Sequence, residues 1–455
     1  MNDFEQLSID GRIATPSDSD WDAARQAWNL VADQRPSAVA FVEHADDVAK
    51  VVRFAADRGL KVAPQGTGHG AVALGPLDDT IIIKTTRMRG VEVDPAAGTA
   101  RVEAGVLALE LGQAAQTEGL CSLPGSSPDV GVAGYTLGGG LSWLGRRYGF
   151  ACNRVKAIEL VSADGEVRRV DRQNDADLFW ALRGGGGSYA IVTAFELALL
   201  PIAELYAGTL ILPAEVGAEA VRAYRDWTET VPEEVTSIVR FLRPPPIPDV
   251  PEPIRDKPLL TIGAACISGQ ADGERTIAPL RAIGEPIMDT FAQIPAAALS
   301  RIHMDPEVPV PGLGHHALVD DLPDEAIDAF VGAAGPEAGS PLLLAELRHA
   351  GGALGRPAED GGALSKLDAS FVMLGIGLPM TPELGEAIDR HLDHLHEVME
   401  PWASRGGYFN FAERPADVDA ILPADTCTRL GEVKRRWDPD GLIRANHNLA
   451  LTPAV

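Results

Sequence analysis

The sequence is poor in positive charge and has no long uninterrupted apolar run. Lys and Arg total 39 against 65 Asp and Glu, which gives a formal net charge of −26. Because positive charge supplies most of the attraction to nucleic acid and to anionic membrane surfaces, we expect neither as a partner. The most apolar stretch, residues 194–216, is interrupted by Glu196, Pro201 and Glu204, so it does not predict a membrane span.

Cysteine is scarce as well. The four cysteines stand at positions 121, 152, 266 and 427, without C-x-x-C spacing, so neither a zinc knuckle nor a disulfide framework is indicated. The amino terminus has no basic segment followed by an apolar run, so it contains no recognisable secretory signal and we expect a cytoplasmic protein. The chain of 455 residues is 45% hydrophobic and 23% charged, a globular composition long enough for two or more lobes.

Hydrophobic periodicity predicts strands alternating with helices over the first two hundred residues. Strands are expected at 38–43, 60–63 and 81–84, a hairpin at 91–104, and helices at 46–59 (capped by Asp46) and 106–118. After residue 205 the strands are longer and are expected at 208–212, 238–242, 259–267, 342–348 and 371–376. Helices are expected there at 218–231, 323–332 and 382–399, the last with Thr381 as cap and Pro382 at its first position.

Three glycine-rich segments stand out, at residues 65–70, 123–140 and 183–193. Glycine in such numbers raises the conformational entropy that is lost on folding. This cost is expected where backbone N–H groups must come close to a phosphate or a flat ring, because a glycine has no Cβ in the way. The alternative is that they form three tight turns. No segment has the strand–turn–helix setting of a dinucleotide fingerprint, and no Walker loop is present, which weighs against phosphoryl transfer. The segments therefore predict a phosphate-bearing cofactor held in another way.

Five segments resemble, in order, those of one flavoprotein superfamily. Gln65-Gly-Thr-Gly-His-Gly70 resembles its R-G-G-G-H-S loop, and Ser127-Pro-Asp-Val-Gly-Val-Ala-Gly-Tyr-Thr-Leu-Gly-Gly-Gly140 resembles its C-P-T-V-G-x-G-G-H-x-x-G-G-G segment. Residues 184–193 are similar to G-G-x-G-x-F-G-I-V-T, and residues 408–411 and 437–443 to the closing Y-x-N-Y and Y-D-P-x-N-x-F pieces. On these segments the chain resembles the vanillyl-alcohol oxidase and berberine-bridge-enzyme superfamily, with its PCMH-type FAD-binding domain.

The resemblance implies an α+β fold of two lobes. It implies an FAD-binding domain at 1–205, a substrate-binding domain at 206–405 built on an antiparallel sheet covered by helices, and a segment at 406–455 that returns to the FAD domain. It also implies FAD as the cofactor, with its pyrophosphate at the loop 66–70. The residues that the resemblance assigns to FAD are Pro64, Gln65, Gly66, Thr67, Gly68, His69, Gly70, Ala71, Gly125, Ser126, Ser127, Val130, Gly131, Gly134, Tyr135, Gly138, Gly139, Gly187, Ala190, Ile191 and Val192.

His69 stands at the position that the resemblance joins covalently to the 8α-methyl carbon of the flavin. An imidazole nitrogen is a competent nucleophile for this reaction, and attachment should raise the redox potential of the flavin and prevent its loss. Relatives with a second bond use a cysteine where this chain has Ser127, so we expect one covalent bond. Tyr135 replaces a histidine near the N1–C2=O edge, where its hydroxyl is expected to donate a hydrogen bond. Cys152 is expected to be a small buried residue, and Ala190 replaces a glycine.

The resemblance further implies hydride transfer from a small organic alcohol, amine or activated ring carbon, in secondary metabolism or catabolism. Val130 stands at the position that controls oxygen access, and valine favours an oxidase that reduces O2 to H2O2. The base of alcohol-oxidising relatives is the last tyrosine of Y-x-N-Y, which is Phe411 here. Its loss favours an amine or an activated ring carbon over a sugar hydroxyl. Two alternatives stay open: a flavin-carrying binding or resistance protein with little turnover, and a dehydrogenase with another electron acceptor.

The remaining catalytic candidates are Tyr408, Asn410, Arg348 and His349. Strand alternation would place Tyr408 and Asn410 on one face, facing the flavin, or else they are an ordinary packed tyrosine and a satisfied amide. Glu346 and Arg348 would share a face of their strand, as catalysts or as a partly buried ion pair, with His349 on the other face. The loop 309–316, with His315 and His316, is expected to form a lid or else a plain surface loop. Three histidines on the helix 382–399 are expected on a solvated face and not at a metal site: His391, His394 and His396.

Overall fold

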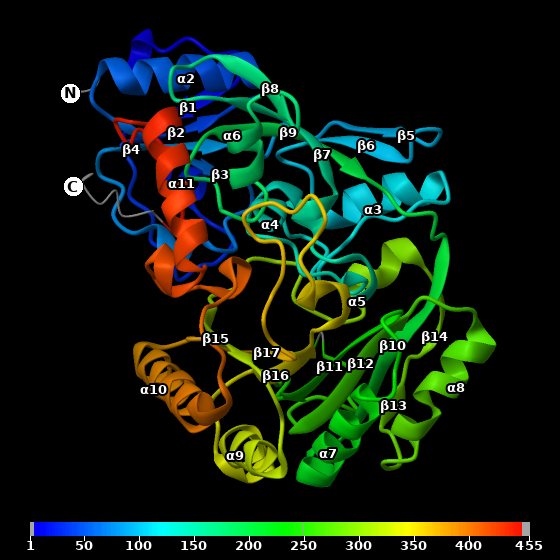
Figure 1. Cartoon of the computed structure of the whole chain (residues 1–455). Helices are drawn as coiled ribbons and strands as arrows, with labels where there is room; N and C mark the ends of the chain where they lie inside the picture. The colour runs from blue at the N-terminus through cyan, green and yellow to red at the C-terminus, as the bar shows by residue number, and fades with distance from the viewer. Residues whose placement is uncertain (1–3, 249, 448–455) are drawn as a thin grey trace.

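The computed structural model describes residues 4–248 and 250–447, which form three β-sheets with helices around them (Figure 1). The first sheet has the order β1-β2-β4-β3, with strands Arg12–Ala14, Ala38–Phe41, Thr80–Lys84 and Lys61–Gln65 in that order. Strands β2 and β3 run parallel to β4, and β1 is antiparallel to β2. Helix α1 spans Trp21–Arg25, and helix α2 (Ala45–Asp57) packs its apolar side, including Val48 and Val52, against this sheet.

The second sheet is antiparallel and has the order β5-β6-β9-β7-β8. Its strands are Val91–Asp94, Thr99–Glu103, Ile191–Ala198, Val155–Val161 and Val167–Asp171 in that order. The helices of this part are α3 (Ala108–Thr117), α4 (Val132–Leu137), α5 (Gly145–Tyr148) and α6 (Ala176–Ala181). The expected hairpin at 91–104 is confirmed as β5 and β6, with Gly98 of the turn at a positive φ of 64°.

The third sheet is antiparallel and forms the second lobe. Its order is β13-β10-β12-β11-β16-β17-β15, with β14 also paired to β10. The strands are β10 (Glu204–Pro213), β11 (Val235–Leu242), β12 (Leu259–Cys266), β13 (Met288–Asp289), β14 (Ala292–Pro295), β15 (Leu313–Val319), β16 (Leu344–His349) and β17 (Phe371–Gly377). Helices α7 (Gly217–Thr228), α8 (Gln270–Arg281), α9 (Asp324–Ala334) and α10 (Pro382–Met399) lie on its side away from the first lobe (Figure 1).

Period-two alternation divides the residues of this sheet between its two faces. Val239 and Leu347 pack into the core under the helices, together with residues of α7, α9 and α10. Arg240, Glu346 and Arg348, one residue out of step, therefore face the first lobe, and Arg240 is directly opposite Glu346 in the register. The strand patterns thus place charged side chains at the junction between the lobes.

The carboxy-terminal segment returns to the first lobe. Helix α11 (Ala424–Trp437) lies beside α6, and residue 443 pairs with Val62 of β3 (Figure 1). Lys434 holds this segment: its buried Nζ donates to the carbonyls of Ser188 (2.6 Å) and Ile443 (3.0 Å) and pairs with Asp438. The third glycine-rich segment and residues 434–443 are therefore tied together. The expected α+β fold is confirmed, and the domain boundaries stay predictions.

Four local expectations are wrong. His44, not Asp46, caps α2, because its Nδ1 accepts the N–H of Asp47. His315 and His316 of the expected loop 309–316 lie in strand β15, which pairs with β17 along its whole length. His391 is not simply solvated, since its Nε2 contacts the carbonyl of Ala333 at 2.8 Å.

Residues 409–411 form a 3₁₀ turn instead of a strand, which is the fourth correction. The expected helix 382–399 is confirmed, and Thr381 caps it by accepting the N–H of Leu384 at 3.2 Å. In the described part of the chain, the helices are too short or too polar to cross a bilayer.

Candidate functional site

The three glycine-rich segments converge on one cavity of the first lobe. With its open mouth the cavity has a volume of about 810 Å³. The end of β3, helix α4, the third glycine-rich segment and the carboxy-terminal segment contribute its wall. Its lining residues are Pro64, Gln65, Gly66, Thr85, Ala104, Ala133, Gly134, Leu137, Gly138, Gly186, Gly187, Ala190, Val192, Phe409, Asn410, Ala445, Asn446 and His447.

Missing side chains create the space in this cavity. A Cβ on Gly66, Gly134 or Gly187 would have no neighbour closer than 3.6 Å, so a side chain there would occupy the cavity instead of packing against protein. At Gly138 the reason is different, because a Cβ would lie 1.7 Å from Oδ1 of Asn410. Glycine at 138 thus lets the carboxy-terminal segment approach the second glycine-rich segment.

Two lining residues carry buried polar atoms that no other described atom satisfies. These are Oε1 of Gln65 and Nδ1 of His447. Buried polar atoms are normally hydrogen-bonded, so unsatisfied atoms in a cavity wall indicate a polar ligand. Together with the glycine-lined surface, they fit the predicted FAD, whose phosphates and flat ring need close backbone approach.

His69 lies beside the cavity in a contact group of its own. Its ring stacks on Trp28, with centroids 3.8 Å apart and 21° between the planes. Its Nε2 is 3.5 Å from Oδ1 of Asp129. The carboxylate also accepts Nε1–H of Trp28 (2.5 Å) and the hydroxyl of Ser127 (3.0 Å). Burial acts to raise the pKa of Asp129, but these three partners hold it below its ordinary value.

The structure divides the predicted FAD residues into two sets. Eight of them line the cavity together with the predicted catalytic residue Asn410. Outside its lining lie Thr67, Gly68, His69, Gly70, Ala71, Gly125, Ser126, Ser127, Val130, Gly131, Tyr135, Gly139 and Ile191. Some of these support the wall: a Cβ on Gly70 would lie 2.6 Å from Nδ2 of Asn446, and one on Gly131 would contact Thr67.

The flavin contact expected of Tyr135 stays a prediction, and its hydroxyl has another partner in this structure. Its hydroxyl donates to the carbonyl of Leu123 at 3.0 Å, and its ring lines a separate small pocket with Leu123 and Pro124. Burial holds its pKa well above the ordinary value, so the hydroxyl is protonated. The backbone carbonyl of Tyr135 serves the site instead, since it accepts Nδ2–H of Asn410 at 2.9 Å.

Tyr408 and Asn410 do come together, through the 3₁₀ turn and not through strand alternation. The buried Tyr408 hydroxyl oxygen accepts the backbone N–H of Leu141 (2.7 Å) and Nδ2–H of Asn410 (3.0 Å). Burial also raises the pKa of Tyr408. A hydroxyl that already accepts two hydrogen bonds is poorly suited to take a proton from a substrate. Phe411 packs edge-on against the Tyr408 ring, with centroids 5.1 Å apart.

A second, smaller cavity lies at the junction of the lobes and joins the predicted residues Arg348, His349 and Ser126. Both terminal nitrogens of Arg348 are 3.4 Å from the hydroxyl oxygen of Ser126, and its guanidinium lies 4.8 Å over the Phe411 ring. Its lining residues are Ser126, Leu141, Ser142, Trp143, Thr236, Ser237, Ile238, Arg348 and His349. Because Leu141 also contacts Tyr408, which contacts Asn410, the two cavities are linked through these three residues.

Behind Arg348 lies a buried charge network. Glu346 accepts Nε–H of Arg348 (2.5 Å), confirming the ion-pair alternative, and its other oxygen contacts Nε2 of His303 (2.8 Å). Nδ1 of His303 contacts Asp305 (2.5 Å), and Arg240 donates to the His303 carbonyl (2.8 Å). Burial acts to raise the pKa of Glu346, but Arg348, His303 and Arg240 hold it far below the ordinary value. The sequence analysis did not single out His303 or Arg240. Arg240 could have been found, because it is a lone arginine in an otherwise apolar strand.

His349 and His316 are uncharged at neutral pH. His349 stacks on Phe371, and its Nδ1 lies 3.1 Å from Nη1 of Arg146. Burial, with the Arg146 charge, lowers its pKa to about 3. His316 accepts the N–H of Tyr408 at 2.8 Å, and burial lowers its pKa to about 4.

Glu413, close to β15, is another residue that the sequence did not single out. Its Oε2 is buried without a hydrogen-bond partner among the described residues. A Cβ on Gly314 of β15 would lie 2.8 Å from its Cδ, so the carboxyl packs directly on the strand. Burial raises its pKa to about 7, although the backbone of Gly314 acts to lower it.

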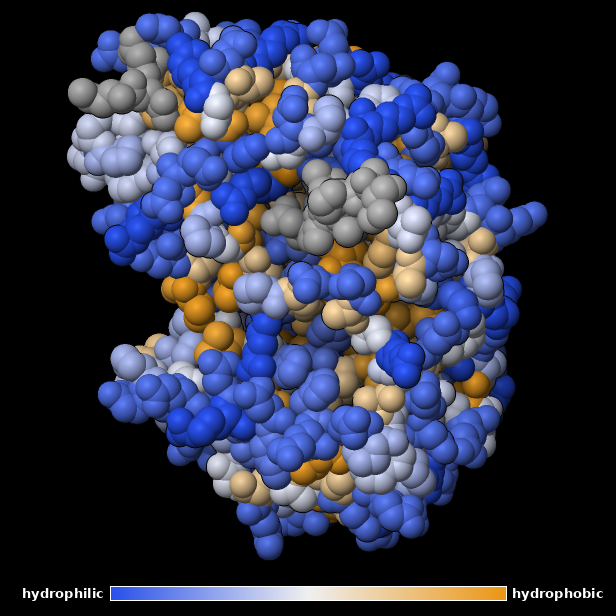
Figure 2. Space-filling model, turned by 60° about the vertical axis from the view of Figure 1, so that its left-hand side comes forward, coloured by the Kyte–Doolittle hydropathy of each residue, from blue (hydrophilic) through white to orange (hydrophobic). Residues whose placement is uncertain are grey.

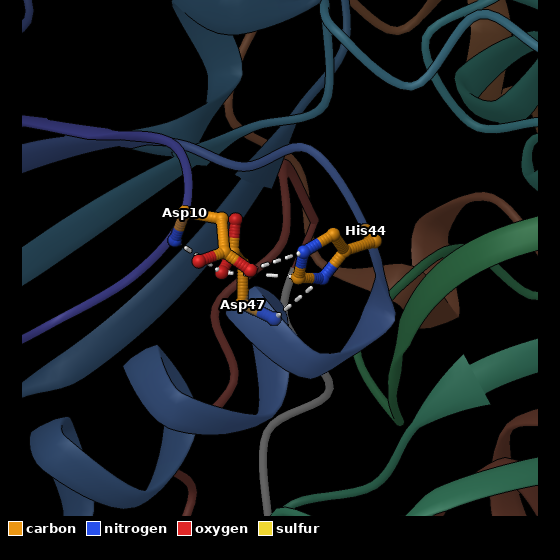
Figure 3. Close-up of side chains that lie close together, drawn as sticks. All are labelled: Asp10, His44 and Asp47. Atoms are coloured by element: carbon orange, nitrogen blue, oxygen red, sulfur yellow. Dashed lines mark hydrogen bonds and ion pairs between the residues drawn. The ribbon is translucent and has the colours of Figure 1, made fainter.

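In the described residues, one trio of side chains has metal-ligand spacing: Asp10, His44 and Asp47 (Figure 3). Its geometry explains it without an ion. The Asp47 carboxylate accepts the backbone N–H groups of Asp10 (2.8 Å), Gly11 (3.0 Å) and Glu43 (3.2 Å). His44 contacts Asp10 at 2.8 Å. The trio anchors the amino-terminal segment to α2.

Comparison with known proteins gives similarity to an FAD-binding family and to oxidases. The FAD binding domain family matches residues 36–171. (R)-6-hydroxynicotine oxidase of Paenarthrobacter nicotinovorans is 28% identical over 97% of both chains. The crystal structure of 6-hydroxy-D-nicotine oxidase from Arthrobacter nicotinovorans superposes with a TM-score of 0.81 at 25% identity, covering 98% of this chain and 99% of that one. A Physcomitrella patens BBE-like 1 variant superposes with a TM-score of 0.85 at 21% identity over 98% of both chains.

Proposed function

We propose that this chain, which belongs to the vanillyl-alcohol oxidase and PCMH-type superfamily of FAD-binding oxidoreductases, is an oxidase of a small organic molecule. In this proposal bound FAD would supply the hydride acceptor for the substrate, and O2 would take the two electrons from the reduced cofactor to give H2O2. The observation that carries the proposal is the convergence of three distant glycine-rich segments and residues 445–447 on one cavity. The substrate approaches from the second cavity, where Arg348 lies.

The cofactor would be held chiefly by backbone. Gly66, Gly134 and Gly187 leave room for its phosphates and ring, and Gln65 and His447 offer the unsatisfied polar atoms. We propose that His69 forms a single covalent bond to the 8α-carbon, because Ser127 offers a hydroxyl and not a thiol for a second. We propose that Val130 is the residue that admits oxygen. Its backbone carbonyl accepts the N–H of Ala108 at 2.9 Å, which fixes its position.

In this proposal the residues that face the substrate orient it, and none of them is suited to remove a proton from it. Phe411 has no acidic proton, the Tyr408 hydroxyl accepts two hydrogen bonds, and His349 is neutral. A neutral amine or an activated ring carbon can release a hydride without a strong base, whereas an unactivated hydroxyl needs one. We therefore propose an amine or an activated ring carbon as the oxidised group, and Arg348 with Ser126 as the substrate's polar anchor.

The test is anaerobic mixing of the purified, FAD-loaded protein with a panel of amines, alcohols and phenolic compounds. An oxidase loses its flavin absorbance with a substrate and regains it on admitting air, with one H2O2 formed per turnover. Reduction followed by sluggish reoxidation would identify a dehydrogenase that uses another acceptor. A flavin that no class of compound reduces would favour a binding protein.

A further inference from the structure

We propose that Asp129 is a positioning residue for flavin attachment: it holds the proton of His69 on Nε2, so that Nδ1 is the nitrogen that bonds to the flavin. The inference rests on the proposed attachment at His69 and names the residue that prepares it. It comes from the contact group of Trp28, His69, Ser127 and Asp129, which is built by three separate segments of the chain.

The geometry gives the two imidazole nitrogens different surroundings. Nε2 is buried and faces Oδ1 of Asp129 at 3.5 Å, with no hydrogen-bond partner of its own among the described residues. No described residue forms a hydrogen bond with Nδ1. A neutral imidazole carries one N–H, and the nitrogen that faces a carboxylate keeps it. Asp129 therefore selects the tautomer in which Nδ1 has the free lone pair that a nucleophile needs.

The carboxylate itself is held in place. Oδ2 of Asp129 accepts Nε1–H of Trp28 at 2.5 Å, and Oδ1 accepts the Ser127 hydroxyl at 3.0 Å. Trp28 also covers one face of the His69 ring by parallel stacking. One tryptophan thus fixes both the imidazole plane and the acceptor that chooses its tautomer. A carboxylate restrained in this way selects one imidazole orientation without reorganising during the reaction.

Asp129 also stabilises the positive charge that forms on the imidazole during attachment. During attachment the 8α-methyl group loses a proton, Nδ1 supplies the electron pair of the new bond to that carbon, and the isoalloxazine ring gains two electrons. O2 removes these two electrons and becomes H2O2. The imidazole, now substituted on Nδ1 and still protonated on Nε2, carries a positive charge. The Asp129 carboxylate lies beside Nε2 and stabilises that charge.

Asp129 is also a departure from the superfamily segment. The C-P-T-V-G pattern has threonine where this chain reads Ser127-Pro-Asp-Val-Gly131. A threonine hydroxyl can replace neither the charge nor the two acceptor oxygens of a carboxylate. The positioning device is therefore a property of this chain's own residues.

The experiment compares wild type with Asp129→Asn, which keeps the shape of the side chain and removes its charge. Each protein is saturated with FAD, and the FAD content of the native protein is measured before acid denaturation and gel electrophoresis, where only attached flavin stays fluorescent. The flavin peptide is then isolated, and the linked imidazole nitrogen is identified by NMR. Asp57→Asn, an exposed acid of the same lobe, is the matched control.

We expect wild type and Asp57→Asn to attach flavin through Nδ1 alone. Asp129→Asn should bind as much FAD but attach it at least about tenfold more slowly, or give a mixture containing the Nε2-linked isomer, because the attraction between the carboxylate and the positively charged imidazole is lost. A merely structural residue would lower FAD content without changing the isomer. Trp28→Phe is the second variant, to be used if Asp129→Asn does not fold. It keeps an aromatic ring against His69 but cannot donate a hydrogen bond to Asp129. It should slow attachment relative to wild type, but by less than the factor expected for Asp129→Asn.

Equal attachment rates and the same single isomer in Asp129→Asn and wild type would overturn the inference. In the Trp28→Phe arm, attachment at the wild-type rate would do the same. A wild-type protein that binds FAD without attaching any would overturn both attachment and the role of Asp129. The proposed oxidase activity would be unaffected by that result, because anaerobic reduction by substrate tests it separately.

Discussion

Gly138→Ala tests whether the carboxy-terminal segment forms the wall of the large cavity. The added Cβ would lie 1.7 Å from Oδ1 and 2.8 Å from Cγ of Asn410, so the amide must move. Asn410 would then lose its hydrogen bonds to the carbonyl of Tyr135 (2.9 Å) and to the Tyr408 hydroxyl (3.0 Å). Two such bonds are worth about 2 kcal/mol together, and overpacking adds about 1 kcal/mol or more.

The measurement is the Tm together with the FAD content of the purified protein. We expect Gly138→Ala to lower Tm by several degrees and to bind FAD less tightly, because a displaced Asn410 also changes the cavity lining. Gly134→Ala is the matched control: it lies in α4, and its Cβ would contact nothing within 4 Å. It should leave Tm unchanged or raise it, since alanine favours a helix by about 1 kcal/mol over glycine.

Gly138→Ala should therefore be less stable than Gly134→Ala, whereas both variants should bind FAD more weakly than wild type. In Gly134→Ala the methyl group projects into the cavity without disturbing the protein around it. A Gly138→Ala protein with wild-type Tm and FAD content would refute the reasoning, because Asn410 could not then occupy its described position.

Three further predictions concern separate parts of the molecule. His69→Ala should retain FAD on a desalting column but lose all fluorescence from the denatured protein band; a band that still fluoresces would place the bond elsewhere. Arg348→Lys keeps the charge beside Glu346 but loses the two-pronged donor, so we expect unchanged flavin absorbance and a KM for the substrate raised about tenfold or more; an unchanged KM would remove Arg348 from the substrate site. Glu413 has a folded-state pKa of about 7, above the ordinary 4.5, so its stabilising contribution is complete below pH 4.5 and is lost as pH rises through 7. The stability of wild type should fall by up to about 3 kcal/mol across this window relative to Glu413→Gln, and parallel Tm curves for the two proteins would contradict this.

The sequence predicts the cofactor site better than the substrate site for a physical reason. Glycine segments and a nucleophilic histidine are local patterns, so residues 65–70 and 183–193 are recognisable without knowing where they meet. The contact of Asp129 with His69, or of His303 with Glu346, joins segments distant along the chain and leaves no periodic signal. Prolines and glycines before His315 predict a loop, but pairing of β15 with β17 overrides that local preference.

A similar limit applies to Tyr408 and Asn410. Alternating aromatic and polar residues predicted a strand, whereas the clearance left by Gly138 and Gly139 accommodates a tight turn instead. Tyr135 stands at the position expected for a flavin contact, yet the nearby carbonyl of Leu123 takes its hydroxyl. Viewed from the side, the molecule shows a notch between its two lobes with hydrophobic residues along its upper edge (Figure 2), a surface feature with no counterpart in the linear pattern.

The closing of the cavity by Asn446 and His447, secured by Lys434 against Ser188, sets an order of events during biosynthesis. A nascent chain that has completed all three sheets still lacks one wall of the pocket. The cavity wall is therefore complete only once residues 445–447 have been synthesised and have docked. A chain without residues 424–447 would lack both this wall and the Lys434 anchor that secures it.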